Sequence, residues 1–148
     1  MSSKAELPRY WREIQVKFSR FYARILLQVG LTLPQYALLS QLTQAGRLPM
    51  TEISEKLHIS KPAVTHLVDR LEKKKCLKRV PHPKDRRIYL LKLEPKGERM
   101  VRRIQSEVLD LILKTLKPFK AHERKTIERF YLLLSKIVGD ALASPEEI

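Results

Sequence analysis

Basic residues are concentrated in one stretch of this 148-residue chain, from residue 70 to residue 103. The stretch holds fourteen lysines and arginines against four acidic residues, so it carries +10 of the chain's net charge of +14. Such a density of positive charge attracts polyanions, and duplex nucleic acid is the commonest of them. The chemistry that these residues offer is therefore the binding of phosphates and of base edges.

Two short segments hold the residue types that read duplex DNA. In the first, at the start of a helix capped by Ser60, Lys61 can donate to guanine, and the small Pro62 and Ala63 suit a thymine methyl group. The second is a basic turn between two apolar segments. We expect DNA contacts from Ser60, Lys61, Pro62, Ala63, Thr65, His66, Arg70, Lys73, Lys84, Asp85, Arg86 and Arg87. The alternative for Pro62 is an ordinary early-helix residue, and for His66 a solvated histidine.

The basic turn carries the stronger signal. A narrow minor groove attracts arginine, and we expect Arg87 to enter it while Arg86 and Lys84 bind phosphates. Asp85 would orient an arginine, because phosphate repels a carboxylate. The alternative for each cation is a solvated surface charge that contributes little.

The sequence lacks the groupings that catalysis requires. It has no paired carboxylates, no Cys/His cluster and no nucleophile elbow, and its four glycines are scattered. We therefore expect no enzyme activity, no metal site and no cofactor. The single Cys76 is expected to be a small buried residue at a helix-to-strand corner; the alternative is a redox-active thiol with a pKa lowered by neighbouring lysines.

The apolar segments are too short for a membrane span, which needs about 18 apolar residues, and none resembles a signal peptide. We expect a cytoplasmic protein without a membrane partner. The length favours a single domain over residues 1–148.

The apolar periodicity predicts the elements that position the basic segments. A helix is expected from Leu7 to Val29, a second from Thr32 to Gly46, a third from Thr51 and a fourth from Ser60. The break at 58–59 makes the last two a helix-turn-helix. Strands are expected at 77–80 and 88–93. Two long helices should follow, one ending near Pro118 and one over 122–142. The expected fold class is mainly α with a small β-hairpin wing.

Apolar residues at both ends of the chain exceed what one small lobe can bury. We expect the helical regions 5–30 and 96–143 to pack against a second copy in a two-fold dimer, with the winged helix-turn-helix lobe at 32–95. The expected dimer interface consists of Tyr10, Trp11, Ile14, Phe18, Phe130, Leu134, Ile137 and Val138.

These segments resemble the MarR family of dimeric winged-helix transcription regulators over residues 7–142. The resemblance is carried by residues 31–39, 53–57 and 62–72, and by Asp85-Arg86-Arg87 followed by Leu91, Leu93 and Gly97. Three residues depart from the family pattern. Lys75 replaces a glycine, so a left-handed backbone there would cost about 1 kcal/mol; Glu94 replaces a capping threonine; and His66 replaces an arginine.

The resemblance also implies a pocket for an aromatic or phenolic effector, with Trp11, Tyr22, Arg24 and Tyr36 as candidates. The alternative is that these aromatic residues are simply part of the core. The function that follows is a sequence-specific dimeric regulator of transcription, a ligand-responsive repressor that binds double-stranded DNA. The alternative is a non-specific architectural, chromatin-like DNA-binding protein.

Overall fold

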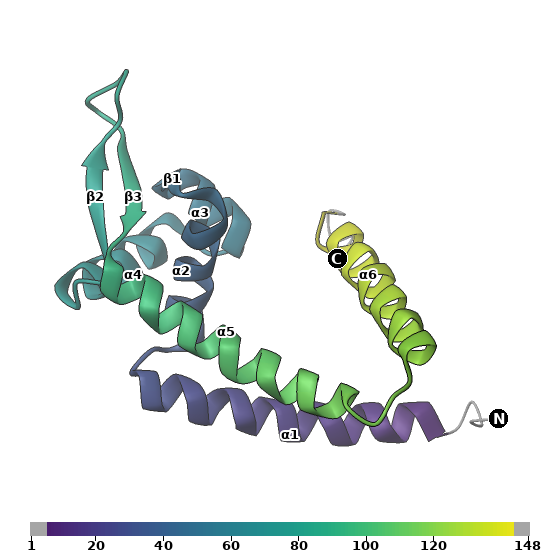
Figure 1. Ribbon diagram of the computed structural model, residues 1–148. Helices are drawn as coiled ribbons and strands as arrows, with labels where there is room; N and C mark the ends of the chain where they lie inside the picture. The colour runs from purple at the N-terminus through teal and green to yellow at the C-terminus, as the bar shows by residue number, and fades with distance from the viewer. Residues whose placement is uncertain (1–5, 144–148) are drawn as a thin grey trace. The chain divides into compact units, whose positions relative to one another are not determined.

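Helices predominate in the structure, a computed structural model that describes residues 6–143 (Figure 1). The elements, in chain order, are α1 (Glu6–Val29), α2 (Leu33–Ala45), β1 (Arg47–Pro49), α3 (Met50–Leu57), α4 (Lys61–Lys73), β2 (Leu77–Pro81), β3 (Tyr89–Leu93), α5 (Pro95–Leu116) and α6 (Ala121–Ala143). The predicted class, mainly α with a small hairpin wing, is confirmed. The chain divides into two compact units, 1–107 and 108–148.

Side-chain caps start two of the helices where the sequence predicted them. Thr32 Oγ1 accepts a hydrogen bond from the Gln35 backbone N–H at 3.4 Å, and Gln35 Oε1 accepts one from the Thr32 N–H at 3.0 Å. Ser60 Oγ caps α4 by accepting from the Ala63 N–H. The predicted start of α3 at Thr51 is wrong by one residue, because α3 begins at Met50 after Pro49 without a side-chain cap.

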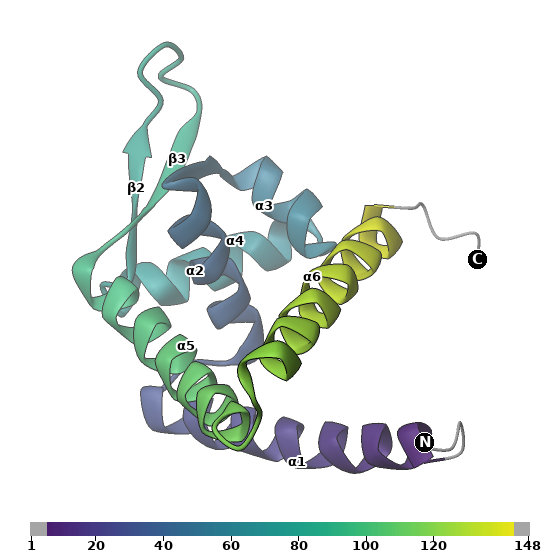
Figure 2. The ribbon, with the colours of Figure 1, turned by 45° about the vertical axis from the view of Figure 1, so that its right-hand side comes forward.

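The hairpin belongs to a three-stranded antiparallel sheet with the order β1-β3-β2. Leu77 lies opposite Leu93, and Arg47 lies opposite Lys92. Strand β1 is missing from the sequence prediction, because three residues that pair with a strand far along the chain leave no periodic pattern. The connection between β2 and β3 extends away from α2, α3 and α4 (Figure 2).

One core joins the helix-turn-helix to the sheet in the first unit. Its fully buried side chains come from every layer of the unit and include Ile25, Leu38, Leu42, Ile53, Val64, Val68, Leu71, Leu91, Val101 and Ile104. Burying each such side chain stabilises the fold by about 1.5–3 kcal/mol. Because α4 and β3 share this core, their relative position is fixed by packing.

The start of α5 lies directly against the start of β2. A Cβ atom on Gly97 would lie 2.1 Å from the carbonyl oxygen of Cys76, and the Glu94 N–H donates to that oxygen at 2.9 Å. Only glycine fits at this contact. Glu94 also pairs with Lys78, with 3.0 Å between Oε1 and Nζ.

Two non-glycine residues adopt left-handed backbone conformations. Lys75 has φ 56° in the turn between α4 and β2, as its place in the glycine position predicted. His58 has φ 50° and ends α3, which lets the chain turn sharply into α4.

The second unit contains the end of α5 and all of α6. Arg124 closes the turn between them: its Nε donates to the carbonyl oxygens of Leu116 and Phe119, and Nη2 donates to that of Lys117. No residue of α6 is buried in the single chain.

No single helix among residues 6–143 is both long and apolar enough to cross a membrane. Helices α1 and α2 meet the length and composition requirements only as a pair, across an 80° bend.

Candidate nucleic-acid interface

Helix α4 has one buried face and one exposed face. Val64, Val68 and Leu71 are fully buried. The predicted DNA-contacting residues on the other face are Lys61, Pro62, Thr65, His66, Arg70 and Lys73, all exposed, and Ala63, which is half-buried. The pattern leaves the first two turns of α4 accessible to a groove, as the sequence analysis expected.

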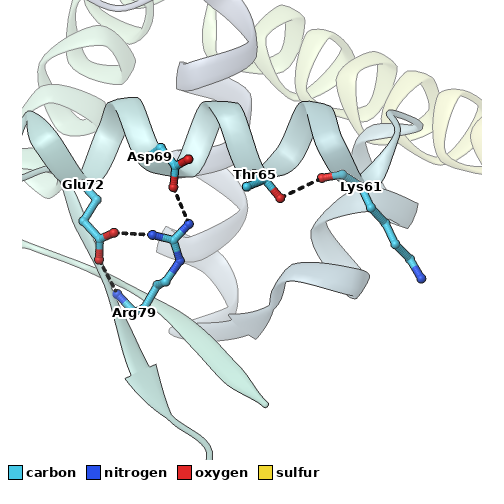
Figure 3. Close-up of polar contacts among 5 residues, drawn as sticks. All are labelled: Lys61, Thr65, Asp69, Glu72 and Arg79. Carbon is cyan, nitrogen blue, oxygen red and sulfur yellow. Dashed lines mark hydrogen bonds and ion pairs between the residues drawn. The ribbon is translucent and has the colours of Figure 1, made fainter. Parts of the chain in front are cut away.

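Two predicted contact residues also have local roles. Ser60 Oγ accepts from the Ala63 N–H at 3.3 Å as the helix cap. Thr65 Oγ1 donates to the Lys61 carbonyl oxygen at 3.1 Å (Figure 3). Each hydroxyl therefore has one hydrogen bond already made, and the oxygen of Thr65 still has lone pairs that can accept.

Arg79 on β2 connects the wing to α4. Its Nη2 donates to Asp69 Oδ1 at 2.6 Å, its Nη1 contacts Glu72 Oε2, and its backbone N–H donates to Glu72 Oε1 at 3.1 Å (Figure 3). Both carboxylates belong to α4. From the sequence, Arg79 was a candidate for contact with the DNA backbone, and its contact with the two carboxylates was not predicted; the signal was two carboxylates, three residues apart, on one flank of a basic helix.

Charge reinforces this connection. Burial lowers the pKa of the Arg79 guanidinium, but the hydrogen bond that Arg79 donates to Asp69 and the charge of Glu72 outweigh this effect and leave the pKa above its ordinary value. Arg79 stays a cation throughout the physiological range.

The turn between β2 and β3 is organised by two side-chain acceptors. His82 Nδ1 accepts from the backbone N–H groups of Lys84 and Asp85, both at 3.2 Å. Asp85 Oδ1 accepts from the Arg87 N–H at 3.0 Å and lies 3.9 Å from Arg87 Nε. The role of His82 was missed; the signal was an acceptor side chain two residues before free N–H groups, as in turns built on Asn or Asp.

The wing cations are free to contact a partner. Lys84, Arg86 and Arg87 are exposed, and the side chain of Arg87 is 95% accessible. Asp85, half-buried, contacts Arg87 as expected of an orienting carboxylate. The turn therefore presents an extended guanidinium on a fixed backbone.

The four predicted effector residues do not form one site within a single chain. The rings of Tyr22 and Tyr36 lie 6.4 Å apart between centroids, and burial raises the pKa of Tyr22. Trp11 lies eleven residues before Tyr22 on the same helix, a rise of about 16 Å. Arg24 stacks instead on Phe21, with 5.4 Å from Cζ to the ring centroid.

Cys76 is fully buried. Its Sγ lies 3.5 Å from Met100 Sδ and donates to the Lys74 carbonyl oxygen. Burial raises the pKa of the thiol, and the charges of Lys96 and Lys74 offset only part of that effect. The burial of Cys76 agrees with the expected small buried residue. No cluster of three metal-ligating side chains exists among the described residues.

The residues predicted at the dimer interface are accessible in the single chain. Exposed apolar side chains among them are Tyr10, Trp11 and Ile14 on α1 and Phe130, Ile137 and Val138 on α6; Phe18 and Leu134 are half-buried.

Comparisons with known proteins show which family this chain is similar to. The sequence model of the MarR family matches residues 31–89. The chain is 30% identical over 126 residues to the multiple antibiotic resistance protein MarR of Salmonella typhimurium, covering 84% of this chain and 85% of that protein. It is 38% identical over 69 residues to the HTH-type transcriptional repressor MdtR of Bacillus subtilis, covering 47% and 44%.

The fold is shared with solved structures. A MarR family protein from Bacillus stearothermophilus superposes with a TM-score of 0.78 at 27% identity, covering 91% of this chain and 94% of the other.

Proposed function

Because this chain belongs to the MarR family of helix-turn-helix transcription regulators, whose members are not enzymes, we propose that it is a homodimeric, sequence-specific repressor. Two copies of α4 would enter successive major grooves of a palindromic operator, and the two wings would enter the flanking minor grooves. DNA binding and transcription regulation are properties of the family; the dimer, the sequence preference and the response to an effector are the proposed part.

The observation that carries the proposal is the joining of α4 to the wing. Arg79 ties β2 to Asp69 and Glu72 of α4, while Arg87 extends from the wing turn with its side chain 95% exposed. A helix and a hairpin held at a fixed separation can engage two grooves without ordering themselves on binding. Less conformational entropy is then lost, which favours specific binding.

Unpaired apolar surface supports the dimer. Phe130, Ile137 and Val138 are 59%, 64% and 48% exposed on α6, and Trp11 is 56% exposed on α1. Soluble monomers rarely leave apolar side chains gathered along a helix, as on α6, open to water. A two-fold dimer that covers them would also set the spacing of the two α4 helices.

The dimer also offers a means of releasing the DNA. Both α4 helices must match grooves about one helical turn apart, so a small effector that changes their spacing would lower the affinity for DNA. The effector shifts the equilibrium only by its preference for the unbound arrangement.

Selection of bound duplexes from a random pool tests the proposal. We expect enrichment of a palindrome with half-sites about 10 bp apart, because dimeric readers match the helical repeat of DNA. A pool that stays random after several rounds, with scrambled duplex bound equally well, would instead identify an architectural DNA-binding protein.

A further inference from the structure

A cavity of about 530 Å³ opens beside the last turns of α4, on the flank away from Asp69 and Glu72. It lies where the end of α1, the start of α2 and the end of α4 meet within the first unit. The residues that matter here are Leu27, Leu31 and Thr32 on one side and Arg70, Lys73 and Lys74 on the other. The volume is in the range of pockets that hold small ligands.

No carboxylate compensates the positive charge of this cavity. Three cations line it, and no lining residue is a carboxylate. The ion pairs recorded among residues 6–143 do not involve Arg70, Lys73 or Lys74. Three like charges at one helix end repel one another, and an anion placed between them removes that repulsion.

One of the three cations is held in place. Lys74 Nζ donates to the Gly30 carbonyl oxygen at 2.6 Å, which fixes the ammonium at the rim and covers the negative end of α1. The capping residues Thr32 and Gln35 of the 13-residue helix α2 line the opposite side, so the positive end of that helix dipole lies near the cavity.

An apolar surface lies beside the cations. The side chain of Leu27 is 83% exposed, although it borders the cavity, and the buried Leu31 forms part of the wall. A ligand that covers these side chains would remove apolar area from water. The lining therefore matches a molecule with an anionic head and an apolar body.

We propose that this cavity is a binding site for a small organic phosphate, with the phosphate on Arg70, Lys73 and Lys74 and the apolar part against Leu27 and Leu31. A phosphate monoester carries close to two negative charges at pH 7, so it suits three cations better than a carboxylate does. The guanidinium of Arg70 can bind two of its oxygens at once.

Occupation of the cavity has a consequence that rests on the proposed function. Arg70 and Lys73 are also the cations of α4 expected to contact the DNA backbone. A ligand phosphate would engage the same side chains, so ligand and DNA would compete, and the compound would act as an inducer.

Titration calorimetry on the DNA-free protein tests the site with phenyl phosphate as the probe. We expect Leu27→Glu, which places a negative charge at the rim, to weaken binding about tenfold or more, a change of about 1.4 kcal/mol. Leu27→Gln has the same shape as Leu27→Glu without the charge; it loses part of the apolar contact and should therefore weaken binding less than Leu27→Glu does. Equal binding by the two variants would overturn the site.

Two further probes test the ligand class. Benzoate has the same ring with one charge, and inorganic phosphate has the charge without the ring; both should bind more weakly than phenyl phosphate. Benzoate binding as tightly would overturn the dianionic head, and inorganic phosphate binding as tightly would overturn the apolar contact.

Measurements of DNA affinity complete the test. Phenyl phosphate should reduce the DNA affinity of the wild type and leave that of Leu27→Glu unchanged. If phenyl phosphate reduces the DNA affinity of Leu27→Glu as much as that of the wild type, the compound acts at another place and the assignment of the cavity is wrong. The calorimetry uses no DNA, so its result does not depend on the proposed function. Failure of the proposed function would appear separately, as a pool of duplexes that stays random after selection.

Discussion

Asp69 of α4 and Arg79 of β2 are joined by a 2.6 Å hydrogen bond between charged groups, ten residues apart in the chain. The pair adds a polar contact between α4 and the wing to the packed core that already holds them together. Because Arg79 also contacts Glu72, one side chain fixes two elements.

We expect Arg79→Ala to lower the free energy of unfolding by about 1–2 kcal/mol, since these groups are half-exposed and solvent screens part of their attraction. Urea denaturation measures this. Arg79→Lys should recover only part of the loss, because an ammonium lacks the fork that spans two carboxylates. Arg86→Ala, which removes an exposed wing cation, should leave stability unchanged; an equal loss there would contradict the specific role of Arg79.

Arg87→Ala should weaken binding to the selected operator by about 1–3 kcal/mol while leaving the dimer intact. The reason is that its exposed guanidinium is the residue best placed to enter the minor groove. Fluorescence anisotropy with labelled operator measures the effect. Arg12→Ala on α1 is the matched control for the loss of one charge, and a similar loss there would mean that only net charge matters.

Phe130→Glu combined with Ile137→Glu should produce monomers in sedimentation velocity experiments. Each is more than half exposed in the single chain, so the change spares the core of the protomer. Loss of one central apolar contact weakens a typical interface by about 2 kcal/mol, or about 30-fold. Lys136→Glu tests whether any added charge on α6 has this effect, and an intact dimer in the double variant would place the interface elsewhere.

Lys75→Gly should raise the free energy of unfolding by about 0.5–1 kcal/mol, because glycine adopts the φ of 56° without the clash of a Cβ atom. Part of the gain is offset by the greater freedom of glycine in the unfolded chain. Lys75→Ala keeps the Cβ atom and should give no gain. Equal stability of the two variants would show that the left-handed backbone costs nothing here.

Cys76 should react with iodoacetamide about a hundredfold more slowly in the native protein than in urea at pH 7.5. Burial restricts access, and the raised pKa lowers the fraction of thiolate at this pH, so both effects have the same sign. Mass spectrometry follows the labelling. Rapid native labelling would favour the redox alternative.

Local signals in the sequence predicted the elements that depend on local chemistry. The caps at Thr32 and Ser60 involve residues three positions apart, and the left-handed conformation of Lys75 was implied by the family resemblance, in which a glycine holds this position. Strand β1 and the role of Arg79 were missed, because both depend on partners that are distant in the chain. Both features are stabilised by contacts that exist only in the assembled fold, and no periodic pattern in the sequence indicates those contacts.

The candidate nucleic-acid interface was likewise predicted only in part. Exposure of the predicted residues on α4 and in the wing agrees with the sequence analysis, since helix periodicity and a basic turn determine it. The supporting contacts of His82 and Asp85 within the turn depend on side-chain orientation, which residue types alone do not specify.

The contact between Gly97 and Cys76 has a mechanical consequence. The backbone of α5 at Gly97 lies against the Cys76 carbonyl oxygen, just before β2. No side chain lies between the two backbones to absorb a movement of one against the other. A tilt of the first turns of α5 would therefore displace the start of β2 directly.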